Sequence, residues 1–112
     1  MQVVSVAPGV LDILIFCSYI NFVKITFDPA KNARNIAERG LPFSMVAEID
    51  WSLAVIIEDT RRDYGEKRWR AFGFIDERLF AVVFTARGDA MHVISFRKAN
   101  AREVRNYGHQ NQ

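Results

Sequence analysis

Several charged side chains in the second half of the chain have the chemistry needed to bind phosphate and to move a proton. Glu66 is a carboxylate at the start of a predicted strand, and Arg68 and Arg70 follow it on one face of that strand. Arg97 and Lys98 follow the last predicted strand. Arginine suits phosphate because its planar fork donates two hydrogen bonds and stays charged at any working pH. Taken alone, Glu66 with Arg68 is more simply a surface ion pair worth about 0 to 1 kcal/mol.

The charge of the chain is unevenly distributed. Its formal net charge is +2, but the stretch from Arg61 to Arg105 holds eleven Lys and Arg against six Asp and Glu, a net +5, which leaves −3 for the remainder. A basic second half suits a polyanion or an acidic protein surface. Before any motif is considered, an ordinary solvated face explains it equally well.

The composition indicates one folded domain without a bound cofactor. A chain of 112 residues with 50% hydrophobic content is long and apolar enough to bury a core. The single cysteine, Cys17, permits no internal disulfide and no zinc cluster. We therefore expect a reducing compartment, the cytoplasm, and chemistry that needs no transition metal.

Residues 1–22 differ from the rest of the chain and are predicted to lie outside the domain, which spans residues 23–112. They are apolar with Asp12 as the single charge, and the run Ile13 to Ile20 is shorter than the roughly 18 to 20 residues of a membrane span. Conceptual translation writes a GUG start codon as valine. We therefore predict that translation begins at Val23 and that the start of the gene was assigned too early. N-terminal sequencing of the natural protein tests this. The alternative is a real extension that adds a strand or covers an apolar surface.

Apolar spacing and turn residues predict an α+β fold for residues 23–112. Asp28 and Pro29 form a helix start, and Gly40 is placed to end that helix after Arg39. A short second helix at 44–48 would bury Met45, Val46 and Ile49. The predicted strands are 23–27, 53–58, 67–74, 79–85 and 90–96, with 79–85 covered on both faces, and a last helix spans 100–107. The expected sheet is antiparallel and four-stranded, plus the short N-terminal strand, packed with two N-terminal helices and one C-terminal helix.

Four stretches of the chain together resemble the BrnT family, the toxin half of bacterial type II toxin-antitoxin pairs. Coverage runs from about Val23 to Tyr107. Where relatives often have His, Arg and Ala, this chain has Arg39, His92 and Phe96. The matching stretches are Phe27 to Lys31 with Asn35, Gly40 and Phe43; Gly65 to Trp69 with Gly73; Arg78 and Leu79 with Thr85; and Ile94 to Ala99 with Arg102, Glu103 and Tyr107.

The resemblance implies a RelE-like fold and a metal-independent endoribonuclease that blocks translation. It also implies a cognate BrnA-type antitoxin that neutralises the toxin and carries a ribbon-helix-helix DNA-binding part, so that the toxin meets operator DNA only indirectly. No membrane partner is expected. Two alternatives stay open: a catalytically inactive corepressor that binds the antitoxin, and an RNA-binding module that does not cleave.

The resemblance also gives the charged residues roles in RNA cleavage, which needs a base for the 2′-hydroxyl, cations for the phosphate and an acid for the leaving oxygen. The catalytic candidates are Glu66 as base with Arg68 and Arg97 as cations. The substrate-binding candidates are Lys31, Arg70, Lys98 and Tyr107, and no metal ligands are assigned. The hypothesis requires the guanidinium groups of Arg68 and Arg97 to gather in one pocket, and opposite sides of the molecule would contradict it.

Some candidates have simpler structural explanations. Lys31 is equally a solvated lysine on the first helix, and Tyr107 is more simply a tyrosine packed on the sheet. His92 has a pKa suited to proton transfer, but alternation places it on the strand face of Ile94 and Phe96, so we predict a partly buried histidine.

Overall fold

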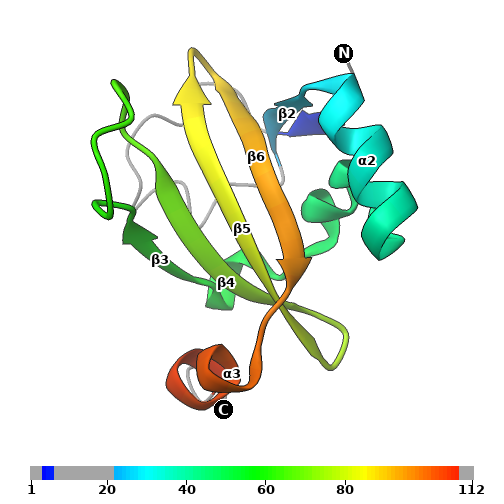
Figure 1. Cartoon of the computed structure of the whole chain (residues 1–112), viewed down its shortest axis with the longest axis vertical. Helices are drawn as coiled ribbons and strands as arrows, with labels where there is room; N and C mark the ends of the chain where they lie inside the picture. The colour runs from blue at the N-terminus through cyan, green and yellow to red at the C-terminus, as the bar shows by residue number, and fades with distance from the viewer. Residues whose placement is uncertain (1–3, 7–21, 109–112) are drawn as a thin grey trace.

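The computed structural model describes residues 4–6 and 22–108, which form one mixed sheet flanked by helices (Figure 1). The order of neighbouring strands is β1-β2-β6-β5-β4-β3. The strands are β1 (Val4–Val6), β2 (Phe22–Phe27), β3 (Val55–Glu58), β4 (Trp69–Ile75), β5 (Arg78–Arg87) and β6 (Ala90–Lys98); the α-helices are α2 (Pro29–Arg39) and α3 (Ala101–Tyr107); the 3-10 helices are η1 (Phe43–Glu48) and η2 (Trp51–Leu53).

The four strands β3 to β6 form the predicted antiparallel meander, but the sheet as a whole is mixed. β2 pairs in parallel with β6, because the chain leaves β2 through α2 and returns to the sheet at its far edge. β1 pairs antiparallel with β2, as in the alternative of an added strand. Most of the segment 1–22 lies outside the described residues, and its status in the natural protein stays a prediction.

The start and end of α2 confirm the capping residues expected from the sequence. The Asp28 side chain accepts a hydrogen bond from the backbone N–H of Ala30, and Gly40 adopts φ +70° at the C-cap. The buried residue of this helix is Asn35, whose amide donates to the backbone oxygens of Leu41 and Phe96, both at 2.9 Å. A polar anchor therefore attaches α2 to the end of β6.

The segment between α2 and β3 is more tightly wound than predicted. The short helix expected at 44–48 is the 3-10 helix η1, and η2 occupies the position where a strand was expected to begin at Leu53. Val46 and Ile49 are buried as predicted, whereas Met45 is only partly buried. The indole N–H of Trp51 donates to the backbone oxygen of Val46 at 3.0 Å, which fixes η2 against η1.

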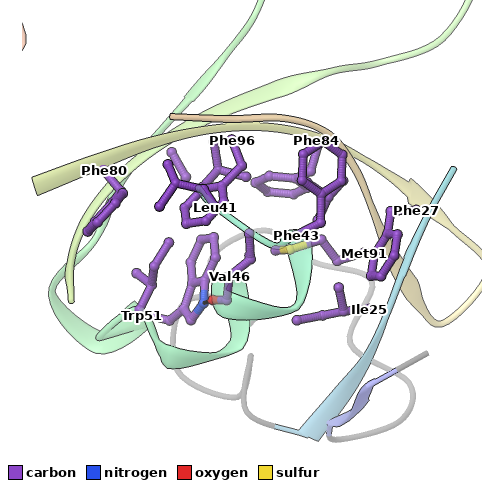
Figure 2. Close-up of a cluster of buried hydrophobic side chains, with 14 residues drawn as sticks. Ile25, Phe27, Leu41, Phe43, Val46, Trp51, Phe80, Phe84, Met91 and Phe96 are labelled. Carbon is purple, nitrogen blue, oxygen red and sulfur yellow. Dashed lines mark hydrogen bonds between the residues drawn. The ribbon is translucent and has the colours of Figure 1, made fainter. Parts of the chain in front are cut away.

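The main core lies between one sheet face and the segment η1 to η2 (Figure 2). Trp51 meets Phe84 edge to face at 6.0 Å between ring centroids, and Phe27 meets Phe43 in the same way at 5.7 Å. The central strand β5 is buried on both faces along most of its length, as predicted. This core fixes which side chains of β4 to β6 point away from it.

The opposite sheet face, called the open face here, carries a smaller apolar cluster of Phe72, Leu79 and Ala81 under α3. The Tyr107 ring stacks on Phe72 with centroids 4.2 Å apart. In Figure 1, β4, β5 and β6 face the viewer with α3 at their lower end, and no described helix crosses their middle. Within residues 4–6 and 22–108, no helix is long and apolar enough to span a membrane.

Candidate active site

The strand register places the polar candidates on the open face in successive rows. Arg70 pairs with Val83 and Val83 with Ser95, which makes the middle row. Phe72, Ala81 and Arg97 form the row next to it on the side of α3. On the other side, Thr26, His92 and Thr85 form a third row, since His92 pairs with both threonines. Residues paired across strands point to the same face, so these rows share one surface.

Glu66 and Arg68 form a partly buried ion pair at one end of the open face. Glu66 Oε2 lies 3.2 Å from Arg68 Nε, and Glu66 Oε1 lies 3.7 Å from a guanidinium nitrogen of Arg87. The guanidinium of Arg68 also lies 4.3 Å above the Tyr64 ring. The Glu66 and Arg68 side chains are 30% and 26% exposed, so this is no freely solvated pair. We call Glu66, Arg68 and Arg87 the Glu66 cluster.

His92 lies beside the Glu66 cluster, on the face opposite the one predicted from alternation. A register shift between Val83 and Phe84 inserts one extra residue of β6, because Val83 pairs with Ser95 whereas Phe84 pairs with Val93. Phe96 and Val93 therefore both enter the main core, although they lie three residues apart. The bulge turns His92 away from Phe96, and the expectation of a shared face was wrong. The histidine is partly buried, as expected.

Among the described residues, the His92 ring makes one hydrogen bond, and four charged side chains act on it. Its Nδ1 lies 2.9 Å from the hydroxyl of Thr26. Burial lowers the pKa of His92 below its ordinary value, and the positive charges of Arg87 and Lys31 lower that pKa further. The carboxylates of Glu66 and Asp28 act in the opposite direction.

Arg97 is held by α3. Its two terminal nitrogens donate to the two Glu103 oxygens at 2.7 and 2.8 Å. Glu103 also closes the capping box of α3 with Asn100, accepting from its N–H at 2.9 Å. These bonds raise the pKa of Arg97 and lower that of Glu103. Glu103 thus supports Arg97 and caps α3 at once.

Arg70 lies in the row between the two arginines predicted to be catalytic. Its guanidinium carbon is 6.0 Å from the Phe72 ring, and its charge helps to lower the pKa of Glu103. Within the described part of the chain, the buried Arg70 Nε has no hydrogen-bond partner. A cleft of about 350 Å³ opens beside it, lined by Arg70, Phe72, Asn100, Arg102, Glu103, Asn106 and Tyr107.

Arg68 and Arg97 share the open face but belong to separate clusters. Their positions differ by two strands, about 10 Å, and by four residues along the strands, about 14 Å. Each guanidinium is also held by its own carboxylate. In the described part of the chain, Arg68 and Arg97 do not lie on opposite sides of the molecule, which would have contradicted the hypothesis. Their guanidinium groups are too far apart for one phosphate, however, and suit two phosphates of one RNA strand.

The remaining candidates lie at the margins of this surface. Lys31 is exposed on α2, close enough to His92 for its charge to act on that ring. Lys98 is exposed and alternates away from Arg97, since it pairs with the core residue Phe80. Among the described residues, no three His, Cys, Asp or Glu side chains gather as a metal site would require. Sequence reasoning did not single out Arg87. The available signal was its position at the end of the apolar run of β5, directly before the turn that leads into β6 and His92.

Comparison with known proteins gives one family. Residues 27–103 match the model of a family described as "Ribonuclease toxin, BrnT, of type II toxin-antitoxin system". A search of the curated proteins gave no match. The matched range begins at the end of β2 and reaches Glu103, so it includes the Glu66 cluster, His92, Arg70 and Arg97.

Proposed function

The chain belongs to the BrnT family of ribonuclease toxins of type II toxin-antitoxin systems, and we propose that it cuts RNA laid across the open face of its sheet. The observation that carries this proposal is the gathering of Arg68, Arg70, Arg87 and Arg97 on one surface formed by three adjacent strands. A row of fixed guanidinium groups suits a chain of phosphates.

The catalytic centre is proposed to be the Glu66 cluster. Arg68 and Arg87 are held by one carboxylate, so both are oriented before substrate arrives. Such preorganised cations stabilise the charge that grows on the phosphate oxygens during attack by the 2′-hydroxyl. Because these cations are side chains, the reaction is proposed to proceed without a metal ion.

Arg97 and Arg70 are proposed to bind another phosphate of the same RNA strand. Arg97 is 36% exposed despite its bonds to Glu103, and the cleft beside Arg70 is open to a ligand. Tyr107 contributes through its stacking on Phe72, which shapes this cleft. Lys31 and Lys98 are exposed and add positive charge to the margins, where they would attract RNA before it settles.

The family match implies an antitoxin partner, and we assign it the open face. An antitoxin of the BrnA type with an acidic segment would cover the same arginines that bind RNA and so block translation arrest. Within this proposal the fold is RelE-like, the toxin acts in the cytoplasm, and operator DNA is bound only through the antitoxin.

The test is RNA cleavage by the purified toxin, freed of antitoxin, in the presence of a chelator. Cleavage is expected for the natural chain, with a loss of at least about 100-fold for Arg68→Ala, since removing one oriented charge donor commonly costs that much. Arg97→Ala should weaken RNA binding and its salt dependence more than the cleavage step.

Arg78→Ala is the matched control. Arg78 is exposed and pairs with Ile75, so it alternates away from the open face, and its loss removes the same charge elsewhere. Cleavage that needs added metal would contradict metal independence. Intact RNA together with operator binding by the toxin-antitoxin complex would favour the corepressor, and RNA binding without cleavage would favour the plain binding module.

A further inference from the structure

Beside the Arg68 and Arg87 side chains, His92 and Glu66 can each accept a proton, and the structure distinguishes them. Both Glu66 oxygens already face guanidinium groups, at 3.2 Å from Arg68 and 3.7 Å from Arg87. Protonation of that carboxylate would weaken both pairs at the moment when the arginines are needed. Glu66 is therefore better suited to orienting cations than to taking up a proton.

The ring of His92 has the opposite character. The β-bulge in β6 directs it to the open face, and its Nδ1 is occupied by the hydroxyl of Thr26 at 2.9 Å. For Nε2 to take up a proton, Nδ1 must carry the ring hydrogen and donate it to the Thr26 hydroxyl, whose oxygen can accept that bond from the neutral and from the protonated ring. The other nitrogen, Nε2, has no hydrogen-bond partner among the described residues and is available to a ligand.

We propose that His92 is the general base of RNA cleavage, with Thr26 and Glu66 as positioning residues. This assignment rests on the proposed ribonuclease site, and it moves the base role from Glu66 to a residue that sequence alternation had turned toward the core. His92 Nε2 takes the proton of the 2′-hydroxyl as the 2′-oxygen forms its bond to phosphorus. The bond from phosphorus to the 5′-oxygen breaks, and that oxygen takes a proton from water. The products are a 2′,3′-cyclic phosphate and a 5′-hydroxyl, and the imidazolium returns its proton to solvent.

The surroundings of His92 favour this role. A base must be neutral before it acts, and burial together with Arg87 and Lys31 lowers the pKa of His92 more than Glu66 and Asp28 raise it. A lowered pKa keeps the His92 ring neutral at pH 7, so activity is lost only as the pH falls through that pKa. These charges come from α2 and its cap, from the end of β5 and from the segment before β4.

The experiment is the pH dependence of single-turnover cleavage of a short RNA. For the natural chain, the rate should fall on the acidic side with a midpoint below the ordinary histidine value of about 6.5. His92→Gln should lose at least about 100-fold in rate and lose this acidic limb. His92→Arg should be equally slow, because arginine carries a positive charge and accepts no proton. Folding of each variant is checked by thermal denaturation.

Controls separate the base from its supports. Glu66→Gln should slow cleavage but keep the acidic limb of the pH profile. Thr26→Val should have the same effect, and Thr26→Ser should restore the cleavage rate because it keeps the hydroxyl. His109→Gln replaces the second histidine of the chain as the matched control and should leave the pH profile unchanged. A natural chain that cleaves while His92→Gln retains its rate within threefold would overturn this inference and leave the ribonuclease site standing. A folded natural chain without cleavage would overturn both.

Discussion

Replacing Glu103 tests whether α3 holds Arg97 as the structure indicates. Glu103→Gln keeps the size of the side chain and one acceptor oxygen, but it removes the charge that two Arg97 nitrogens share at 2.7 and 2.8 Å. A hydrogen bond to a charged group contributes about 1.5 to 3 kcal/mol. Because the Arg97 side chain is 36% exposed, solvent screening puts the expected loss of unfolding free energy in the lower range, about 1 to 2 kcal/mol.

The pairwise part of this loss is measured by a double-mutant cycle. Urea unfolding of the natural chain, Glu103→Gln, Arg97→Ala and the double variant should give a coupling free energy of about 1 kcal/mol or more. Glu77→Gln, in the exposed turn between β4 and β5, is the matched control and should change stability by less than about 0.5 kcal/mol. A coupling within about 0.3 kcal/mol of zero would refute the reasoning, because the two side chains would then contribute independently.

Three further predictions concern stability. Gly73→Ala should destabilise the fold by about 1 to 3 kcal/mol, because a Cβ there would lie 2.5 Å from Ile49 Cγ2. In an Ile49→Ala background, which is itself less stable, thermal denaturation should show a smaller cost for the same substitution. Hydrogen bonds from Arg61 hold the pKa of the buried Asp59 far below its ordinary value. The ionised carboxylate therefore stabilises the fold fully above pH 4, and this contribution is lost as the pH falls toward the pKa of Asp59 in the folded chain. Urea midpoints measured between pH 2 and 7 should fall on acidification, and those of Asp59→Asn should fall less. Asn35→Ala should cost about 2 to 3 kcal/mol in chemical denaturation, since two backbone oxygens lose their buried donor, and an unchanged midpoint would show that α2 is not anchored there.

Local chemistry made much of the fold predictable. Asp28, Pro29 and Gly40 define α2 because capping depends on neighbours in sequence, and the apolar run of β5 revealed a strand buried on both faces. The parallel pairing of β2 with β6 was not predictable in this way, since it depends on where the chain returns after α2. The 3-10 form of η1 depends likewise on packing under the sheet.

The site shows the same division between local and distant causes. Glu66 and Arg68 are two residues apart on extended chain, and their pairing was foreseen. His92 was misplaced because strict alternation counted back from Phe96 and missed the bulge. The signal that was available is the local pattern around it: Met91 and Val93 flank His92 and are both apolar, which indicates that His92 itself points away from the core.

The position of β2 beside β6 has a consequence for when the chain can act. The hydroxyl of Thr26 and the ring of His92 are 66 positions apart in the sequence, and they meet only across the parallel pair. During synthesis, β6 is the last strand to leave the ribosome, so β2 lacks its parallel partner until nearly all of the chain has been made. A truncated or nascent polypeptide thus lacks the surface on which we propose that RNA is cut, and under that proposal the toxin cannot attack the messenger that encodes it until translation is almost complete.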